Sequence, residues 1–326
     1  MTKTYSVASV TVASNAAHRL PRQLDALTQQ SRKLDEIIVV DNASSDGTAD
    51  MLAARYPEVT VLSLHENGGV GGGYAAGLTH AAIAKRHAWT WLLDDDSVPA
   101  PEGLQKLLEG LQYLTEATAR TAILAPLCVN LKTSMSYPGL SWQGGRLVPT
   151  PGDPGQPLTF VDSVISSGSL IRREAVEAVG LPRVDFFIDF VDHEYCLRLG
   201  RSGFRIAVVR DSILDHEIGA QTTINILGRK KFWADHDPWR EYYMARNETF
   251  TIWQHYPQPI TKGFVVYKFA HHALGIVLFG KQKLSCLGMM CRGFMDGRAG
   301  RLGIRFLPEK REQAKPYPLD SFHPAN

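Results

Sequence analysis

Short apolar runs and amphipathic stretches alternate along the first hundred residues. Runs rich in Val, Ile, Leu or Trp predict β-strands, and Leu or Ala at helical spacing predicts helices between them. The expected strands cover 6–14, 35–42, 59–64 and 89–93, and the expected helices cover 19–30, 48–56 and 78–87. This alternation is typical of a mostly parallel, doubly wound sheet with helices on both faces, so an α/β fold is predicted.

The pattern changes further along the chain. The segment around 130–160 is rich in Pro and Gly and predicts loops or a hairpin. A strand and a helix are then expected within 160–180, a helix within 187–203 and a strand over 204–216. After about residue 235 the pattern is mostly helical. We therefore expect an α/β domain over 1–235 and a helical, basic C-terminal region over 236–326.

Composition narrows the class of protein. Hydrophobic residues make up 44% of the chain and charged residues 21%, which is typical of a globular protein. The net charge of +2 gives no argument for nucleic-acid binding. The four cysteines lack C-x-x-C spacing, which argues against a zinc site or disulfide framework and favours a reducing compartment. Because the first residues contain no signal-peptide-like segment, a cytoplasmic location is expected.

Charge is unevenly distributed. Between Thr261 and Glu312 there are ten Lys or Arg residues and three acidic residues. Two interpretations of this region stay open: peripheral association with an anionic membrane surface, or a helical subdomain that forms homo-oligomers. The apolar stretch 263–280 is interrupted by Lys268 and two histidines, which makes it a poor candidate for a membrane span.

Polar residues follow several of the predicted strands. Asp41, Asn67 with Gly68, and Asp94–Asp96 all lie where a strand ends, and in a parallel sheet such ends converge on one crevice. Side chains alternate along an extended segment, so Asp94 and Asp96 are expected on one side and Asp95 on the other. Paired carboxylates suit Mg²⁺ or Mn²⁺, which would also offset their repulsion. The alternative is a solvated acidic turn.

The glycine-rich stretch NGGVGGGYAAG begins at Asn67. It contains no G-K-[ST] and follows the third strand rather than the first, so it fits neither a Walker A loop nor a dinucleotide fingerprint. We interpret its glycines as permitting close approach of the backbone to a ligand or tight packing of a helix on a strand. A mobile loop before a helix is the alternative.

Taken in order, five motifs carry a family resemblance. They are VVDNASSDGT, NGGVGGGYAAG, WLLDDDSVP, FIDFVDHEYCLRLGRSGF and LDH. Over roughly residues 5–250 the chain resembles the family 2 glycosyltransferases with the GT-A fold. The triple Asp, the glycine-rich loop and the later REYYMARN are most similar to bacterial galactofuranosyltransferases and related rhamnosyltransferases.

The resemblance implies roles for particular residues. Asp94 and Asp96 match the family's D-x-D element, which binds the metal and the donor nucleotide, and His216 matches a histidine ligand of metal-dependent members. Asp41 matches the acidic residue near the nucleoside, and Asn67, Gly68 and Asp95 are expected to contact the donor. The segment FVDHEYCLR matches the one that holds the catalytic base, and Asp192 is the matching position.

The residues themselves leave some of these roles open. Sugar transfer with inversion needs one general base on the acceptor hydroxyl, and on chemistry alone Asp192 and Glu194 are both candidates. Asp189 is better interpreted as a helix cap or an ion-pair partner. His216, at the end of a strand, is either a metal ligand or a buried, hydrogen-bonded histidine.

The segment 237–250 is dense in aromatic residues and arginine. Arg240 or Arg246 could hold a diphosphate, and Tyr243 could stack on an acceptor sugar. The alternative is a helix whose aromatic side chains lie in the core.

Together these observations predict an inverting, metal-dependent glycosyltransferase. It would bind the nucleotide sugar with residues 1–100 and the acceptor with 101–235. UDP-galactofuranose is the first expectation for the donor and dTDP-rhamnose the second, and the acceptor is expected to be a cell-surface or lipid-linked glycan. Two alternatives remain: a nucleotidyltransferase, although the first strand lacks a following glycine cluster, and a non-catalytic sugar-nucleotide binding protein.

Overall fold

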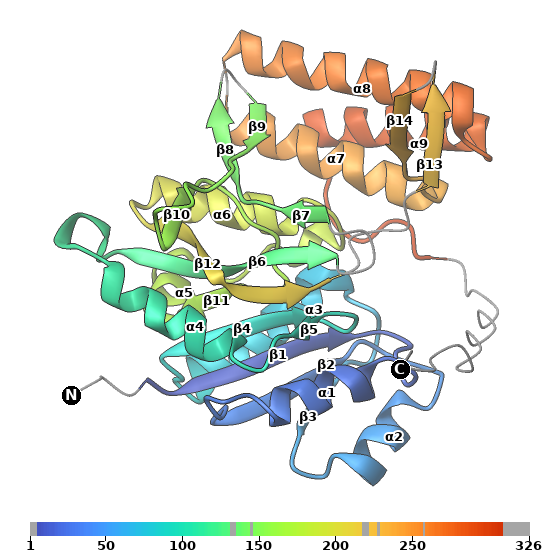
Figure 1. Ribbon diagram of the computed structural model, residues 1–326. Coiled ribbons are helices and arrows are strands. Elements are labelled where there is room, and N and C mark those ends of the chain that lie inside the picture. The colour runs from blue at the N-terminus through green and yellow to red at the C-terminus, as the bar shows by residue number, and fades with distance from the viewer. Residues whose placement is uncertain are drawn as a thin grey trace, which may run out of the picture.

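The computed structural model describes residues 5–130, 135–143, 146–216, 222–226, 229–256 and 258–308. A twisted, mostly parallel sheet forms its centre, and Figure 1 shows helices on both of its faces. The strands of its main path, in spatial order, are β10 (Leu158–Val161), β12 (Arg205–Asp215), β6 (Thr121–Asn130), β11 (Leu170–Arg172), β4 (Trp89–Asp94), β1 (Val7–Ala13), β2 (Glu36–Asp41) and β3 (Thr60–Ser63).

The pairing explains which strand ends meet. Strands β3, β2, β1 and β4 run parallel, as the alternating pattern predicts, so their carboxyl ends share one edge. Strand β11 is antiparallel to both β4 and β6, whereas β12 is parallel to β6. A short strand, β5 (Val98–Pro99), pairs with the end of β12. This last pairing draws the chain just after Asp96 towards the segment that ends at His216.

Two apolar cores lie on the two faces of the sheet. One face is covered by α3 (Gly69–Leu78), α5 (Arg173–Val179) and α6 (Val191–Arg201). The other is covered by α1 (Leu20–Thr28), α2 (Thr48–Arg55) and α4 (Gly103–Glu109). Alternate residues of β1 point to opposite faces: Val10 and Val12 lie in the first core, and Val7 and Ala13 lie in the second.

The middle of the chain is more strand-rich than the sequence pattern predicts. Within 160–180 the structure has the end of β10, then β11 and α5, rather than one strand and one helix. The Pro-rich and Gly-rich segment forms β7 (Met135–Tyr137) and the hairpin of β8 (Leu140–Gln143) with β9 (Arg146–Pro149). The hairpin prediction is thus confirmed. The extra strand was missed because β11 is only three residues long.

Helices dominate the C-terminal region, as expected. They are α7 (Pro238–His255), α8 (Pro259–Phe279) and α9 (Lys283–Arg298), preceded by the hairpin of β13 (Thr222–Ile226) and β14 (Arg229–Trp233). In Figure 1 the three helices lie together beyond α6, at the top of the view. In the described part of the chain, no helix combines the length and the apolar character that crossing a membrane requires. The expected region 236–326 also includes residues 309–326, which lie outside the described residues.

The glycine-rich stretch belongs to a helix. Helix α3 begins at Gly69, inside the stretch, and continues through a π-helical segment, η1 (Thr79–Ala84). A Cβ atom built on Gly73 would lie 2.4 Å from Val12 Cγ1, and one on Gly77 would lie 2.2 Å from Val10 Cγ1. These glycines therefore let α3 lie directly against β1. Of the interpretations above, this is tight packing of a helix on a strand.

We predict that Gly77→Ala destabilises the fold by about 1–3 kcal/mol, because the added methyl overpacks the contact with the stiff Val10 side chain. Gly72→Ala is the matched control: it is in the same helix, and a Cβ there meets nothing within 4 Å. The control should gain up to about 1 kcal/mol from helix propensity. Urea unfolding of both variants measures the difference, and equal midpoints would contradict the packing argument.

Candidate active site

Residues predicted to contact the donor lie at the end of β2 and before the start of α3. Asn42, directly after β2, donates from Nδ2 to the Gly69 carbonyl at 3.0 Å and accepts from the Gly68 amide at 2.8 Å. Asn67 Oδ1 accepts from the Gly69 amide at 2.8 Å. Asp41, which is buried, accepts from the Ser44 amide. The structure thus brings together Asp41, Asn67 and Gly68, and it adds Asn42 as the residue that orients the glycine turn.

The three residues predicted as metal ligands lie together. One ligand atom from each of Asp94, Asp96 and His216 falls within 4.8 Å of the other two. His216 Nε2 is 3.7 Å from Asp94 Oδ2, and Nδ1 is 3.2 Å from Asp96 Oδ1. The β5–β12 pairing supplies this approach across more than a hundred residues of sequence. Two carboxylates and an imidazole are a suitable donor set for Mn²⁺, and the carboxylates also suit Mg²⁺.

The pKa values of Asp94 and Asp96 shift in opposite directions in this environment. Burial raises the pKa of Asp94 to about 6, and the neighbouring acids add to the rise, against the opposing effects of His216 and Tyr74. Burial alone would raise the pKa of Asp96 as well, but the hydrogen bond and charge of His216 outweigh it and lower that pKa. The same two acids raise the pKa of His216 although its burial acts in the other direction.

Hydroxyl groups of neighbouring residues form hydrogen bonds with the predicted metal-ligating residues. The Tyr74 hydroxyl donates to Asp94 Oδ1 at 2.7 Å, and Ser167 Oγ accepts from the Asp94 amide at 3.1 Å. Ser97 Oγ lies 2.5 Å from Ser167 Oγ and 2.9 Å from His216 Nδ1. Such outer contacts orient ligands and set the tautomer of a coordinating histidine. His216 is therefore both buried and hydrogen-bonded, and it still presents Nε2 towards Asp94.

Sequence reasoning missed these supporting residues. Gln23, on α1, donates to the backbone carbonyls of Asp94 and Ser97 and so fixes the acidic turn. Tyr74, Ser97 and Ser167 contact the ligands only through the fold. One signal was available, because Tyr74 stands in the glycine-rich motif itself and α3 places it beside the end of β4.

Asp95 points away from the cluster, as strand alternation predicts. Its carboxylate accepts from Arg19 Nε at 2.8 Å and Nη2 at 2.9 Å, and from the Ser14 amide at 3.3 Å. Both oxygens are therefore engaged by the end of β1 and the start of α1. This geometry favours a structural role for Asp95, and the donor contact expected from the sequence stays a prediction.

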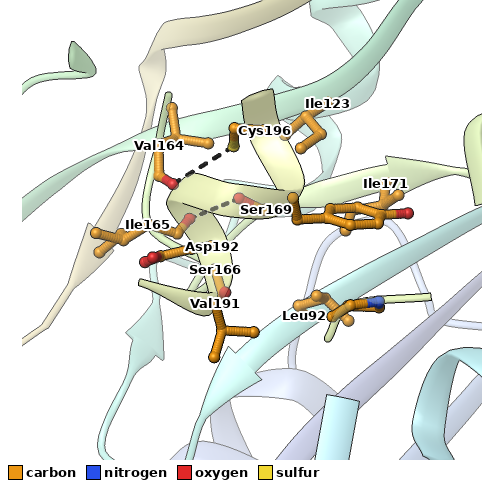
Figure 2. A pocket seen from close by; sticks show the side chains of 12 residues that line it. Leu92, Ile123, Val164, Ile165, Ser166, Ser169, Ile171, Val191, Asp192 and Cys196 are labelled. Atoms are coloured by element: carbon orange, nitrogen blue, oxygen red, sulfur yellow. Dashed lines mark hydrogen bonds between the residues drawn. The ribbon is translucent and has the colours of Figure 1, made fainter. Parts of the chain in front are cut away.

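Asp192 lies in the first turn of α6, beside a small, mainly apolar pocket. Figure 2 shows it with Val191, Val164 and Ile165 on the pocket wall. Asp192 Oδ1 accepts from the His193 amide at 2.7 Å. The charge of Asp192 contributes to the raised pKa of Tyr74, the residue that holds Asp94. The predicted base therefore lies within electrostatic range of Tyr74, which in turn contacts Asp94.

Glu194 has a different environment. It is buried, with 1% of its side chain exposed, and accepts from Arg198 Nε at 2.8 and 3.0 Å. His255 Nε2 is 3.5 Å away. A carboxylate enclosed in this way is poorly placed to take a proton from an acceptor hydroxyl. Of the two acids left open by the chemistry, the geometry favours Asp192.

The polar groups of Arg240, Arg246 and Tyr243 make contacts within the protein. Arg240 forms a bidentate ion pair with Asp189 at 2.9 and 3.0 Å, the role expected for that acid. Arg246 is fully buried and donates to the carbonyls of Asp185 and Phe186. Tyr243, also fully buried, hydrogen-bonds through its hydroxyl to the backbone at Arg305 and Phe306. These contacts favour the core-helix alternative over the predicted diphosphate and acceptor contacts.

Polar side chains of α7 support the loop that precedes Asp192. Phe187, Asp189 and Phe190 all have positive φ, between 58° and 66°, which is strained for side chains of this kind. Asn247 Nδ2 donates to the carbonyls of Phe186, Ile188 and Asp189. Helix α7 thus holds the loop in the conformation from which α6, and with it Asp192, begins.

Comparison with known proteins identifies the family. The sequence model described as glycosyl transferase family 2 matches residues 9–180. This chain is a family 2 glycosyltransferase. It is 30% identical over 261 residues to the galactofuranosyltransferase GlfT1 of Mycobacterium tuberculosis, covering 77% of this chain and 83% of the relative. It is 27% identical to the dTDP-rhamnosyl transferase RfbF of Shigella flexneri, covering 86% and 93%.

Solved structures support the fold. A crystal structure of GalNAc-T7 with UDP, GalNAc and Mn²⁺ superposes with a TM-score of 0.57 at 15% identity, covering 76% of this chain. The chain spans about half the length of that protein, 47%. Staphylococcus aureus TarS superposes with a TM-score of 0.51, covering 85% of this chain and 44% of its own. This family 2 enzyme therefore has the expected GT-A fold, with helices at its C-terminal end.

The opposite pKa shifts predict opposite effects of two neutralising substitutions in metal-free protein. The pKa of folded Asp94 is raised, so its ionisation destabilises the fold as pH rises from about 4 through 6, and Asp94→Asn should raise the melting temperature at about pH 7.5. The pKa of folded Asp96 is lowered, so its ionised form stabilises the fold above its unfolded pKa, and Asp96→Asn should lower the melting temperature there.

Thermal melts in EDTA across this pH range measure both effects. The gain from Asp94→Asn should shrink towards pH 4, because the wild-type carboxyl is then protonated in the folded state and is close to its ordinary pKa of 3.8 in the unfolded state. Two substitutions that shift the melting temperature in the same direction at neutral pH would contradict the assigned environments.

Proposed function

We propose that this glycosyltransferase moves a sugar from a nucleotide donor to a glycan acceptor with inversion at the anomeric carbon. The observation that carries the proposal is the Asp94–Asp96–His216 cluster at the strand edge, with the carboxylate of Asp192 on a neighbouring helix. In this proposal residues 1–100 bind the donor, and residues 101–235 supply the base and the acceptor site.

The proposed chemistry assigns each group one task. Asp192 accepts the proton of the acceptor hydroxyl as its oxygen attacks the anomeric carbon, and the bond to the nucleoside diphosphate breaks on the opposite side. Asp94, Asp96 and His216 would hold Mn²⁺ or Mg²⁺, which supplies positive charge to the leaving diphosphate. Asp41, Asn67 and Gly68 would contact the nucleoside.

For the donor we propose UDP-galactofuranose first and dTDP-rhamnose second. The higher identity of the galactofuranosyltransferase GlfT1 supports the first choice, and the rhamnosyl transferase RfbF, which matches more of the chain at lower identity, supports the second. The proposed acceptor is a lipid-linked or cell-surface glycan. We also propose that the protein acts in the cytoplasm, with its C-terminal region at the membrane, while homo-oligomer formation stays a prediction.

We predict that Asp192→Asn lowers kcat by about 10²–10⁴-fold while donor affinity changes little, because the substitution removes a general base that does not contact the donor. Asp96→Ala should abolish metal-dependent donor binding. Calorimetry with UDP and dTDP, with Mn²⁺ or EDTA, measures binding, and release of nucleoside diphosphate from a panel of nucleotide sugars measures turnover.

Asp50→Asn, at an exposed carboxylate on α2, is the control and should match the wild type in both assays. Near-normal turnover by Asp192→Asn would overturn the base assignment. Metal-dependent nucleotide binding without any sugar transfer would instead support the non-catalytic alternative.

A further inference from the structure

Helix α8 exposes a continuous apolar stripe to solvent. Figure 1 places this helix at the outer edge of the C-terminal helices. Its outward side chains are between 46% and 70% exposed, an unusual state for large apolar residues gathered on one element: Ile260, Val266, Tyr267, Leu274, Val277 and Leu278. A soluble surface rarely keeps such a stripe uncovered, so the stripe indicates a contact.

The exposed apolar residues occupy one face of α8, and the opposite face is buried. Thr261, Val265 and Ile276 are buried on the opposite side, and Ile276 belongs to a core with Ala245 of α7 and Met290 of α9. At 100° per residue the stripe spans an arc of about 120°, and at 1.5 Å per residue it is about 27 Å long. Helix α8 is therefore apolar on two sides, of which one is already packed against the protein.

Basic residues border the stripe. Lys262 and Lys268 fall on either side of the arc, the arrangement of a helix that lies in the plane of a lipid interface. Lys268 Nζ is ion-paired with Glu248 at 2.7 Å, which leaves Lys262 as the bordering lysine that can meet a headgroup. Beyond the end of α8, Lys281 and Lys283 precede Leu284, which is 87% exposed. The described segment 258–308 contains eight Lys or Arg residues and one acidic residue, Asp296, which pairs with Arg301.

We propose that the α8 stripe, with the lysines around it, is the surface by which this protein binds an anionic membrane. Apolar side chains enter the interface between headgroups and acyl chains, and Lys262, Lys281 and Lys283 contact the anionic headgroups. A second copy of the chain is a poorer occupant, because pairing the stripe with itself would bring two basic surfaces together. The inference extends the proposed function, since a lipid-linked acceptor would lie at this surface.

Flotation with lipid vesicles tests the proposal. The full-length protein should bind phosphatidylcholine vesicles that contain phosphatidylglycerol, more weakly at high salt, and should bind pure phosphatidylcholine poorly. Leu274→Glu should weaken binding about tenfold or more, because a charge replaces a side chain that enters the interface. Lys281→Glu combined with Lys283→Glu should remove most of the dependence on phosphatidylglycerol.

Tyr113→Glu is the matched control, since Tyr113 is 51% exposed on a 3₁₀ turn that follows α4, and it should bind like the wild type. Circular dichroism melts check that each variant is folded. The measurement needs no donor or turnover, so it stands whether or not the proposed reaction is correct. Absence of vesicle binding by the wild type, or equal binding by Leu274→Glu, would overturn the proposal. A dimer that Leu274→Glu converts to monomers in sedimentation would assign the stripe to a second copy instead.

Discussion

Repulsion among three adjacent carboxylates at the end of β4 is the constraint on which the site depends. Like charges this close are tolerated only with compensating partners. Asp95 is directed to Arg19, Asp96 is directed to His216, and the Tyr74 hydroxyl donates to Asp94, whose pKa is raised by burial. The partners come from α1, the end of β12 and α3, so much of the α/β fold is needed to keep the three acids in place.

The part of the fold set by local pattern could be predicted from the sequence. The strands up to β4, helices α1 and α2 and the division of the acidic triplet follow from alternation and from the rule that parallel strand ends converge. The helix expected over 78–87 begins earlier, at Gly69, and its expected part is mainly π-helical. Helix α3 was harder to predict because glycine has low helix propensity, and here contact with β1 overrides it. The short strand β11 carried too few residues for a pattern.

Residues that act through distant contacts could not be predicted in the same way. Arg246 is a candidate ligand-binding residue in the sequence, yet it and Asn247 bind carbonyls of a loop about 60 residues earlier in the chain. Nothing local to 237–250 indicates that loop or its positive φ angles. The C-terminal helices therefore do more than extend the catalytic domain, since α7 completes the segment that carries Asp192.

Gly69 and Gly71 connect the glycine turn at the start of α3 to the loop that precedes Asp192. The Gly71 amide donates to the Phe187 carbonyl at 3.1 Å, and a Cβ on Gly69 would lie 2.2 Å from the same oxygen. The glycine turn and the loop before Asp192 thus share one backbone contact with no room between them. For protein engineering, residues 66–72 and 183–190 form a single module. Grafting one of these segments from a relative with another donor preference requires grafting the other with it.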